Sequence, residues 1–199
     1  AAVGEWMRRY KVPAYDEATG KGLVRHVYVR VNRKGESLCC VVINGRQAPR
    51  EPELAAYVCA AVPHTAGVLV NSNTKRGNVI LGEKYRTLWG RDYLMDTLCG
   101  LEFKLSVPSF YQVNRDQAEA LYGKALDYAG LTGRETVLDL YCGIGTITLC
   151  LAKRAGRVIG AEIVPAAIRD AKENAARNHI ENAEFFCGDA AETAARLEA

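Results

Sequence analysis

Acidic residues and glycines in the second half of the chain have the spacing of a ligand-binding site. Asp139 ends the apolar run VLDL, Gly143 and Gly145 follow in the turn CGIG, and Glu162 ends the next apolar run, VIGAE. Glycines accept backbone angles that are closed to other residues and put no side chain in the way of a ligand. A carboxylate can accept both hydroxyl hydrogens of a ribose. These residues predict a site for a ligand that carries a nucleoside.

The residues around the turn indicate which nucleoside ligand it is. A dinucleotide-binding turn has a third glycine, and Thr148 stands at that position. Asp139 instead suits a cationic ligand, such as the sulfonium and ammonium groups of S-adenosylmethionine. Asp189 in CGDA follows a third apolar run and can accept a hydrogen bond from an adenine amino group. We expect S-adenosylmethionine as the cofactor; the alternatives are a dinucleotide enzyme and an α/β domain that binds nothing.

The elements that must position these residues follow one another as strand, helix, strand, helix, strand. TVLDLY, RVIGAEI and AEFFCGD predict strands, and Pro165 begins the second of the two helices between them. A further helix before TVLDLY is capped by Asn114 and stopped by Gly130. This order with short loops predicts a parallel sheet, and ligands bind beyond the carboxyl ends of such strands.

The first hundred residues have a different pattern. LVRHVYVRV alternates, which predicts a half-buried strand with one polar and one valine face. SLCCVVI, GVLVNSN, NVILGE, YRTLWG and LEFKLS predict further strands, mostly antiparallel, and EPELAAYVCAAV predicts a helix. The predicted fold class is α/β: a central α+β sheet domain over residues 1–107, followed over residues 108–199 by the first half of a Rossmann-like S-adenosylmethionine-dependent methyltransferase domain.

Charge and cysteine usage narrow the class of protein. The net charge is +3, but residues 1–125 hold 18 Lys and Arg against 12 Asp and Glu, so the front part is the basic part and fits a polyanion. The seven cysteines are scattered without a C-x-x-C pair, which predicts reduced thiols, no metal site and a cytoplasmic protein. No apolar run is long enough to predict a membrane span.

Taken together, the motifs resemble a known family. PSFYQVN, VLDLYCGIGTITLCLA, VIGAEIVPAAIRDAKENAARN and AEFFCGDAAE resemble the RNA uracil-5 methyltransferases, and most of all the 23S ribosomal RNA (uracil-5-)-methyltransferases. KGLVRHVYVRV, GVLVNSNTKRGNVILG and YRTLWGRDYLMDTL resemble that family's central domain. The resemblance implies methyl transfer from S-adenosylmethionine to carbon 5 of a uridine in 23S ribosomal RNA. A non-catalytic RNA-binding module and a small-molecule methyltransferase are the alternatives.

The resemblance also implies roles for individual residues. Gln112 would contact the cofactor from outside the sheet, Tyr141 would lie along it, and Thr146 would add a contact after the glycines. Glu162 would hold the ribose and Asp189 would meet the adenine. A Gln112 that only ties down a loop and a Tyr141 that packs in the core are the alternatives.

Ribosomal RNA as partner requires contacts that hold a distorted strand while a base leaves its stack. We expect these contacts on an outer strand face and at a turn tip, with a merely solvated surface as the alternative for each. The predicted RNA-binding residues are Arg25, His26, Arg30, Lys75 and Arg76.

The chain departs from the family in what it lacks. It has no N-terminal barrel domain and no cysteine cluster for an iron–sulfur centre, and the nucleophilic cysteine and the base of the family lie beyond its last residues. We therefore expect a fragment without catalytic residues that is inactive alone and exposes apolar surface through which it can self-associate. We expect Cys142, Cys150 and Cys187 to pack in the core. His179 stands where the family has glycine, so it is expected in a strained left-handed conformation.

Overall fold

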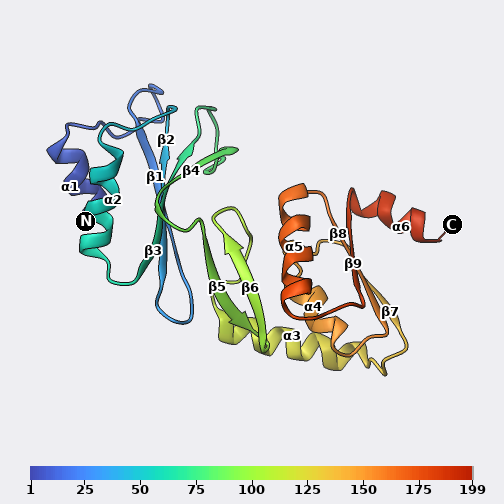
Figure 1. Ribbon diagram of the computed structural model, residues 1–199. Helices are drawn as coiled ribbons and strands as arrows, with labels where there is room; N and C mark the ends of the chain where they lie inside the picture. Colours follow the sequence, from blue (N-terminus) through green and yellow to red (C-terminus); the bar gives the residue numbers. More distant parts are fainter. Residues whose placement is uncertain (199) are drawn as a thin grey trace. The chain divides into compact units, whose positions relative to one another are not determined.

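The computed structural model describes residues 1–198, which form two compact units (Figure 1). The first unit comprises Ala1–Leu94 and Ser106–Pro108, and the second comprises Met95–Leu105 and the described residues from Ser109 onward. None of the helices in the described part has the length and apolar character that crossing a membrane requires. Within the same residues, no cluster of three or more His, Cys, Asp or Glu side chains is placed to hold a metal ion.

The first unit is built on a four-stranded sheet of order β1-β2-β3-β4. Strands β1 and β2 pair antiparallel, as do β3 and β4, whereas β2 and β3 run parallel. A parallel pair needs a crossover connection, which α2 supplies. The elements of this unit are α1 (Ala2–Arg9), β1 (Val24–Val31), β2 (Ser37–Ile43), α2 (Glu51–Ala61), β3 (Thr65–Ser72) and β4 (Lys84–Gly90).

Apolar side chains are buried on both faces of this sheet. One face packs against α1 and α2, and its fully buried members include Trp6, Leu54, Val41 and Ile43. The other face holds a smaller cluster of Leu38, Cys40, Leu69, Leu94 and Val107. The strand β2 is therefore buried along its whole length, which explains why SLCCVVI is apolar without alternation.

The sequence predicts that the alternating valines of β1 are buried and that its polar residues are exposed, and the structure shows the reverse. Val27 and Val29 are 46% and 56% exposed, whereas Tyr28 and Arg30 are partly buried on the opposite face. Val27 pairs with Val41 and lies on the helix-covered face, but β1 is an edge strand whose valines remain bare. The predicted strand is confirmed. An alternating pattern shows that a strand has two different faces, but it does not show which of them the rest of the protein covers.

Three local predictions for this unit were wrong or missing. The segment NVILGE (residues 78–83) is not a strand but part of a loop. The helix α1 was not predicted. Nor was the strand β5 (Tyr93–Leu98), whose sequence YLMDTL had been included only in the family resemblance.

The second unit contains the parallel sheet that the sequence predicts, with the order β7-β8-β9. Asn114 caps α3 by accepting a hydrogen bond from the backbone N–H of Gln117, and Gly130 ends that helix at φ 57°. Pro165 begins α5, as predicted. The elements are β6 (Leu101–Ser106), α3 (Arg115–Ala129), β7 (Thr136–Asp139), α4 (Thr146–Ala152), β8 (Arg157–Glu162), α5 (Pro165–Arg177), β9 (Ala183–Cys187) and α6 (Ala190–Glu198).

Strands β5 and β6 form a two-stranded sheet of their own. Leu98, Leu101 and Phe103 are buried in the same core as Leu149 of α4 and Ile168 of α5. The boundary between the compact units therefore falls within β5, and Ser106–Pro108 return to the first unit. The assignment of residues 1–107 as a central domain and of residues 108–199 as half of a methyltransferase domain stays a prediction.

Candidate functional site

The turn after β7 has a left-handed backbone conformation, which favours glycine, at two positions. Gly143 and Gly145 have φ angles of 54° and 86°. A Cβ atom on Gly145 would lie 3.3 Å from the ring of Phe185, whereas a Cβ on Gly143 would meet no atom within 4 Å. Gly145 is thus needed for packing and for its backbone angle, and Gly143 faces open space, as a residue beside a ligand should.

Glu162 is fixed next to this turn at the end of β8. One carboxylate oxygen, Oε2, accepts a hydrogen bond from the backbone N–H of Gly143 at 3.2 Å. The other, Oε1, accepts one from the backbone N–H of Val164 at 2.9 Å. Each carboxylate oxygen has a second lone pair. Glu162 is therefore held in one orientation and can still accept the two hydroxyl hydrogens of a ribose.

Asp139 is hydrogen-bonded to Thr148, the residue that stands in place of the third glycine of a dinucleotide-binding turn. The hydroxyl of Thr148, which is fully buried, donates to Oδ2 of Asp139 at 2.6 Å, and the backbone N–H of Tyr141 lies 3.4 Å from Oδ1. Burial raises the pKa of Asp139 above its ordinary value; the charge of Glu162 also raises it, while the two hydrogen bonds oppose the rise. Thr148 thus holds the acid in place, a role that the sequence analysis missed.

A buried asparagine on α5 connects the turn to β6. The side-chain amide of Asn174 donates to the carbonyl of Ile144 at 3.1 Å, and its oxygen accepts from the backbone N–H of Lys104 at 2.8 Å. One helical turn later, Asn178 exchanges two hydrogen bonds with the backbone of Glu102. The sequence analysis missed both residues, although an asparagine on the buried face of a helix is a signal that could have identified Asn174.

Two predicted cofactor contacts lie at the turn itself. Tyr141 is 81% exposed, so the alternative that it packs in the core is wrong. The hydroxyl of Thr146 lies 3.1 Å from that of Tyr122, whose pKa is raised chiefly by burial. Thr146 therefore has a structural partner, and a cofactor contact for either residue stays a prediction.

Asp189 and Gln112 lie on the segments that border the sheet. Asp189 caps α6, because its Oδ1 accepts from the backbone N–H groups of Ala191 at 2.8 Å and Glu192 at 3.3 Å. Gln112 is half-buried in the connection between β6 and α3. The cap explains why an acid follows β9 whether or not adenine binds, so both cofactor roles stay predictions.

The cysteines differ in exposure. Cys142 and Cys150 are buried, as predicted. Burial, together with the charges of Asp139 and Glu162, raises the pKa of the Cys142 thiol to about 12, so this group is not a thiolate at neutral pH. The prediction for Cys187 was wrong: its side chain is exposed, because it is the last residue of the edge strand β9.

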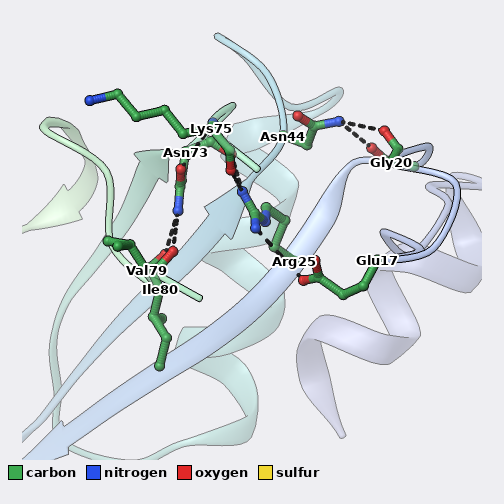
Figure 2. A network of polar contacts seen from close by, with 9 residues as sticks. Glu17, Gly20, Arg25, Asn44, Asn73, Lys75, Val79 and Ile80 are labelled. Carbon is green, nitrogen blue, oxygen red and sulfur yellow. Dashed lines mark hydrogen bonds and ion pairs between the residues drawn. The ribbon is translucent and has the colours of Figure 1, made fainter. Parts of the chain in front are cut away.

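The residues predicted to contact RNA fall into two groups. The side chain of Arg25 is 0% exposed, so its predicted place on an outer face is wrong; it lies among the loops shown in Figure 2. His26 and Arg30 are partly buried, and Arg30 donates to the hydroxyl of Tyr28 at 2.8 Å. Lys75 is 82% exposed at its side chain and Arg76 is also exposed. RNA contacts through these residues stay a prediction.

The proteins that this chain is similar to include methyltransferases. Residues 131–198 match the family model of a methyltransferase domain. The chain is 45% identical to an uncharacterized RNA methyltransferase of Halalkalibacterium halodurans over 94% of its own length and 41% of that protein. It is 41% identical to an uncharacterized RNA methyltransferase of Clostridium acetobutylicum over 98% of its length and 43% of the relative. The chain thus spans about two fifths of these relatives.

Solved structures share its fold. The tRNA (uracil-54, C5)-methyltransferase of Pyrococcus abyssi, in complex with S-adenosyl-L-homocysteine, superimposes with a TM-score of 0.76 and 24% identity, over 94% of this chain and 45% of that one. Trm5b of Pyrococcus abyssi superimposes with a TM-score of 0.53 and 20% identity, over 84% of this chain and 48% of that one. The predicted Rossmann-like methyltransferase fold is confirmed.

Proposed function

We propose that this chain is the cofactor-binding part of an S-adenosylmethionine-dependent enzyme that methylates carbon 5 of a uridine in RNA. The observation that carries the proposal is the carboxylate of Glu162, which is fixed beside Gly143 with one lone pair left on each oxygen. The relatives named as RNA methyltransferases support RNA as the substrate.

The residues around the turn fit this cofactor. Glu162 would hold the ribose, Asp139 would attract the cationic end, and Tyr141 offers an exposed ring beside Gly143. We infer that Gln112, Gly145, Thr146 and Asp189 complete the site. When bound, S-adenosylmethionine supplies an electrophilic methyl group.

The acceptor chemistry requires groups beyond this site. Carbon 5 of uracil is a poor nucleophile until a thiolate adds to carbon 6, and a base must then remove the proton from carbon 5. Cys142 is a poor candidate, since it is 4% exposed and its pKa is raised to about 12. We infer that the nucleophile and the base come from outside these 199 residues, and that the chain alone binds the cofactor without methylating RNA.

Ribosomal RNA is the target that we propose. The motifs around the glycine turn resemble the enzymes that act on 23S ribosomal RNA, and the basic front part of the chain fits a polyanion. Transfer RNA is the second candidate, because the Pyrococcus abyssi neighbour is a tRNA methyltransferase.

Calorimetry with S-adenosylhomocysteine tests the cofactor site. Glu162→Gln should lower the affinity by about 10-fold or more, which corresponds to about 1.4 kcal/mol. Glu184→Gln is the matched control, because Glu184 is exposed on β9 and pairs with Arg157 away from the turn. Unchanged affinity in Glu162→Gln, or no heat with the wild type, would refute the proposed site.

Methyl transfer is tested separately on the full-length protein. Ribosomal RNA and tRNA transcripts are incubated with cofactor labelled in the methyl group, and the digested nucleosides are identified by mass spectrometry. We expect label in 5-methyluridine from ribosomal RNA. Label in another nucleoside would refute carbon 5 as the target, and label in tRNA alone would refute ribosomal RNA.

A further inference from the structure

The connection between β3 and β4 is an exposed loop with an unusual surface. Residues 74–80 are all exposed, and they include the cations Lys75 and Arg76. The aliphatic side chains of Val79 and Ile80 are 70% and 48% exposed on the same loop. Bare aliphatic groups next to two cations favour a ligand that has both apolar and anionic parts.

Two buried asparagines at the end of β3 fix this loop. Asn73 donates to the carbonyls of Val79 at 2.6 Å and Ile80 at 3.1 Å, and its oxygen accepts from the backbone N–H of Lys75. Asn71, which is fully buried, exchanges two hydrogen bonds with the backbone of Gly82. Backbone groups of Lys75, Val79 and Ile80 therefore have partners within the protein although the loop forms no strand (Figure 2).

Arg25 supports the same loop from β1. Its Nη1 donates to the carbonyls of Asn73 at 3.0 Å and Lys75 at 2.7 Å, and Nη2 lies 3.7 Å from the carboxylate of Glu17. The guanidinium also lies 4.5 Å from the centre of the Tyr15 ring. Burying an arginine costs free energy unless its groups are paired, so this arrangement is stable only when the loop keeps the conformation that supplies the two carbonyls.

We propose that the loop of residues 74–80 is a preorganised RNA-binding surface and that Arg25 is its positioning residue. Lys75 and Arg76 contact phosphates, and Val79 and Ile80 pack against a base or a ribose. The inference rests on the proposed function in one respect, that the partner is RNA. A loop that is already ordered loses little conformational entropy when it binds.

The positive charge of the loop fits an anionic partner such as RNA. The ammonium of Lys75 lies 2.9 Å from the carboxylate of Glu83 in a fully solvated ion pair. Such a pair is readily exchanged for a phosphate, since surface ion pairs contribute little to stability. Glu83 therefore competes with the phosphate for Lys75. Removing the charge of Glu83 should increase the affinity for RNA.

The experiment measures binding of the full-length protein to a fluorescein-labelled, single-stranded oligoribonucleotide rich in uridine, by anisotropy at several salt concentrations. Lys75→Ala/Arg76→Ala should weaken binding and reduce the slope of log affinity against log salt by about 1.4, since each contact with single-stranded phosphate contributes about 0.7. The matched control is Arg33→Ala/Lys34→Ala, which removes two exposed cations from the turn between β1 and β2. It should leave the slope nearly unchanged.

Three further variants separate the parts of the proposal. Glu83→Gln should tighten binding. Val79→Ser/Ile80→Ser should weaken it about 10-fold without changing the salt slope, because no charge is lost. Arg25→Met removes the Nη1 donor to both carbonyls, and because the buried Arg25 makes no phosphate contact in this proposal, binding should weaken at an unchanged salt slope.

The native fluorescence of Trp6 and Trp89, which both belong to the first unit, serves as the folding control and should be the same in all variants. RNA affinities of the two loop double variants equal to that of Arg33→Ala/Lys34→Ala would overturn the inference, and so would retained binding of a polyanionic peptide but not of RNA. If these affinities change as expected while no 5-methyluridine forms, the reaction proposed above fails and the RNA-binding loop stands.

Discussion

Replacing Asn174 by alanine should destabilise the second unit and weaken cofactor binding together. The substitution removes the only side chain that joins the carbonyl of Ile144 to the backbone N–H of Lys104 among the described contacts. Asn174 is 0% exposed and Ile144 is 1% exposed, so water does not easily replace the amide. An unsatisfied buried donor or acceptor costs about 1–3 kcal/mol, and two of them cost about 2–6 kcal/mol.

Asn178→Ala is the matched control. Asn178 caps the C-terminus of the same helix, where its amide also donates to the carbonyl of Asn174, and the variant loses two hydrogen bonds to β6, both to Glu102. These bonds are solvent-exposed, so water can replace them, and each contributes about 0.5–1.5 kcal/mol net. We expect Asn174→Ala to lose about 1–3 kcal/mol more stability than Asn178→Ala.

The position of the tryptophans makes the assay specific. Trp6 and Trp89 are the only two tryptophans, and both belong to the first unit. Urea unfolding followed by tryptophan fluorescence should therefore stay unchanged in both variants, while the transition followed by far-ultraviolet circular dichroism shifts. The affinity for S-adenosylhomocysteine should fall in Asn174→Ala and stay near the wild-type value in Asn178→Ala, since only Asn174 contacts the glycine turn.

Equal losses of stability in the two variants would refute this reasoning. So would a shift of the fluorescence transition in Asn174→Ala, which would mean that the effect is not confined to the second unit. Lower stability with unchanged cofactor affinity would show that the amide supports the core and does not position the turn.

Three other predictions concern single residues. His179 has the predicted left-handed conformation, φ 54°, so His179→Gly should stabilise the protein by up to about 1 kcal/mol in urea unfolding; a loss of stability would contradict this. At about pH 8, iodoacetamide should modify the exposed Cys187 much faster than the buried Cys142, as peptide mass spectrometry would show. Because burial raises the pKa of Asp139, the folded protein binds the carboxyl proton of Asp139 more tightly than the unfolded chain does. The stability of the wild type therefore falls as the pH rises from the ordinary pKa of an aspartate through the raised pKa of the folded state. Relative to wild type, Asp139→Asn should therefore gain stability as the pH rises above about 4, and a difference independent of pH would contradict it.

The parallel sheet and its helix termini were predictable because each depends on local chemistry. An apolar strand, a glycine turn and an amphipathic helix specify a βα unit with little help from the rest of the chain. Asn114, Gly130 and Pro165 mark helix termini because their side chains or rings act on the nearest backbone. The positions of Asp139 and Glu162 at strand ends follow directly from that order.

The faces and loops of the first unit were less predictable, because they depend on distant partners. Val27 and Val29 alternate with polar residues, yet they stay exposed because the core on the α1 and α2 side of the sheet does not include them. Arginine is usually found at the surface, and the burial of Arg25 depends on distant partners: the carbonyls of Asn73 and Lys75, the carboxylate of Glu17 and the ring of Tyr15. The apolar segment at residues 78–83 has the pattern of a strand. Its carbonyl groups accept hydrogen bonds from the side chains of Asn71 and Asn73 instead of from a neighbouring strand.

A buried asparagine supports each of the two binding surfaces proposed for this protein, the loop of residues 74–80 and the glycine turn after β7. A loop that presents residues to a ligand leaves backbone groups without the partners that a helix or a sheet supplies. The amide side chain carries donors and an acceptor, so it can pair with both the carbonyl and the N–H groups of a loop. Asn73 does this from the end of β3, and Asn174 does it from α5. Both loops are thereby ordered before any ligand arrives, and the free energy of ordering them is part of folding rather than of binding. For both surfaces, loss of the asparagine should therefore reduce stability and ligand affinity together, whereas loss of a contact residue such as Lys75 should reduce affinity alone.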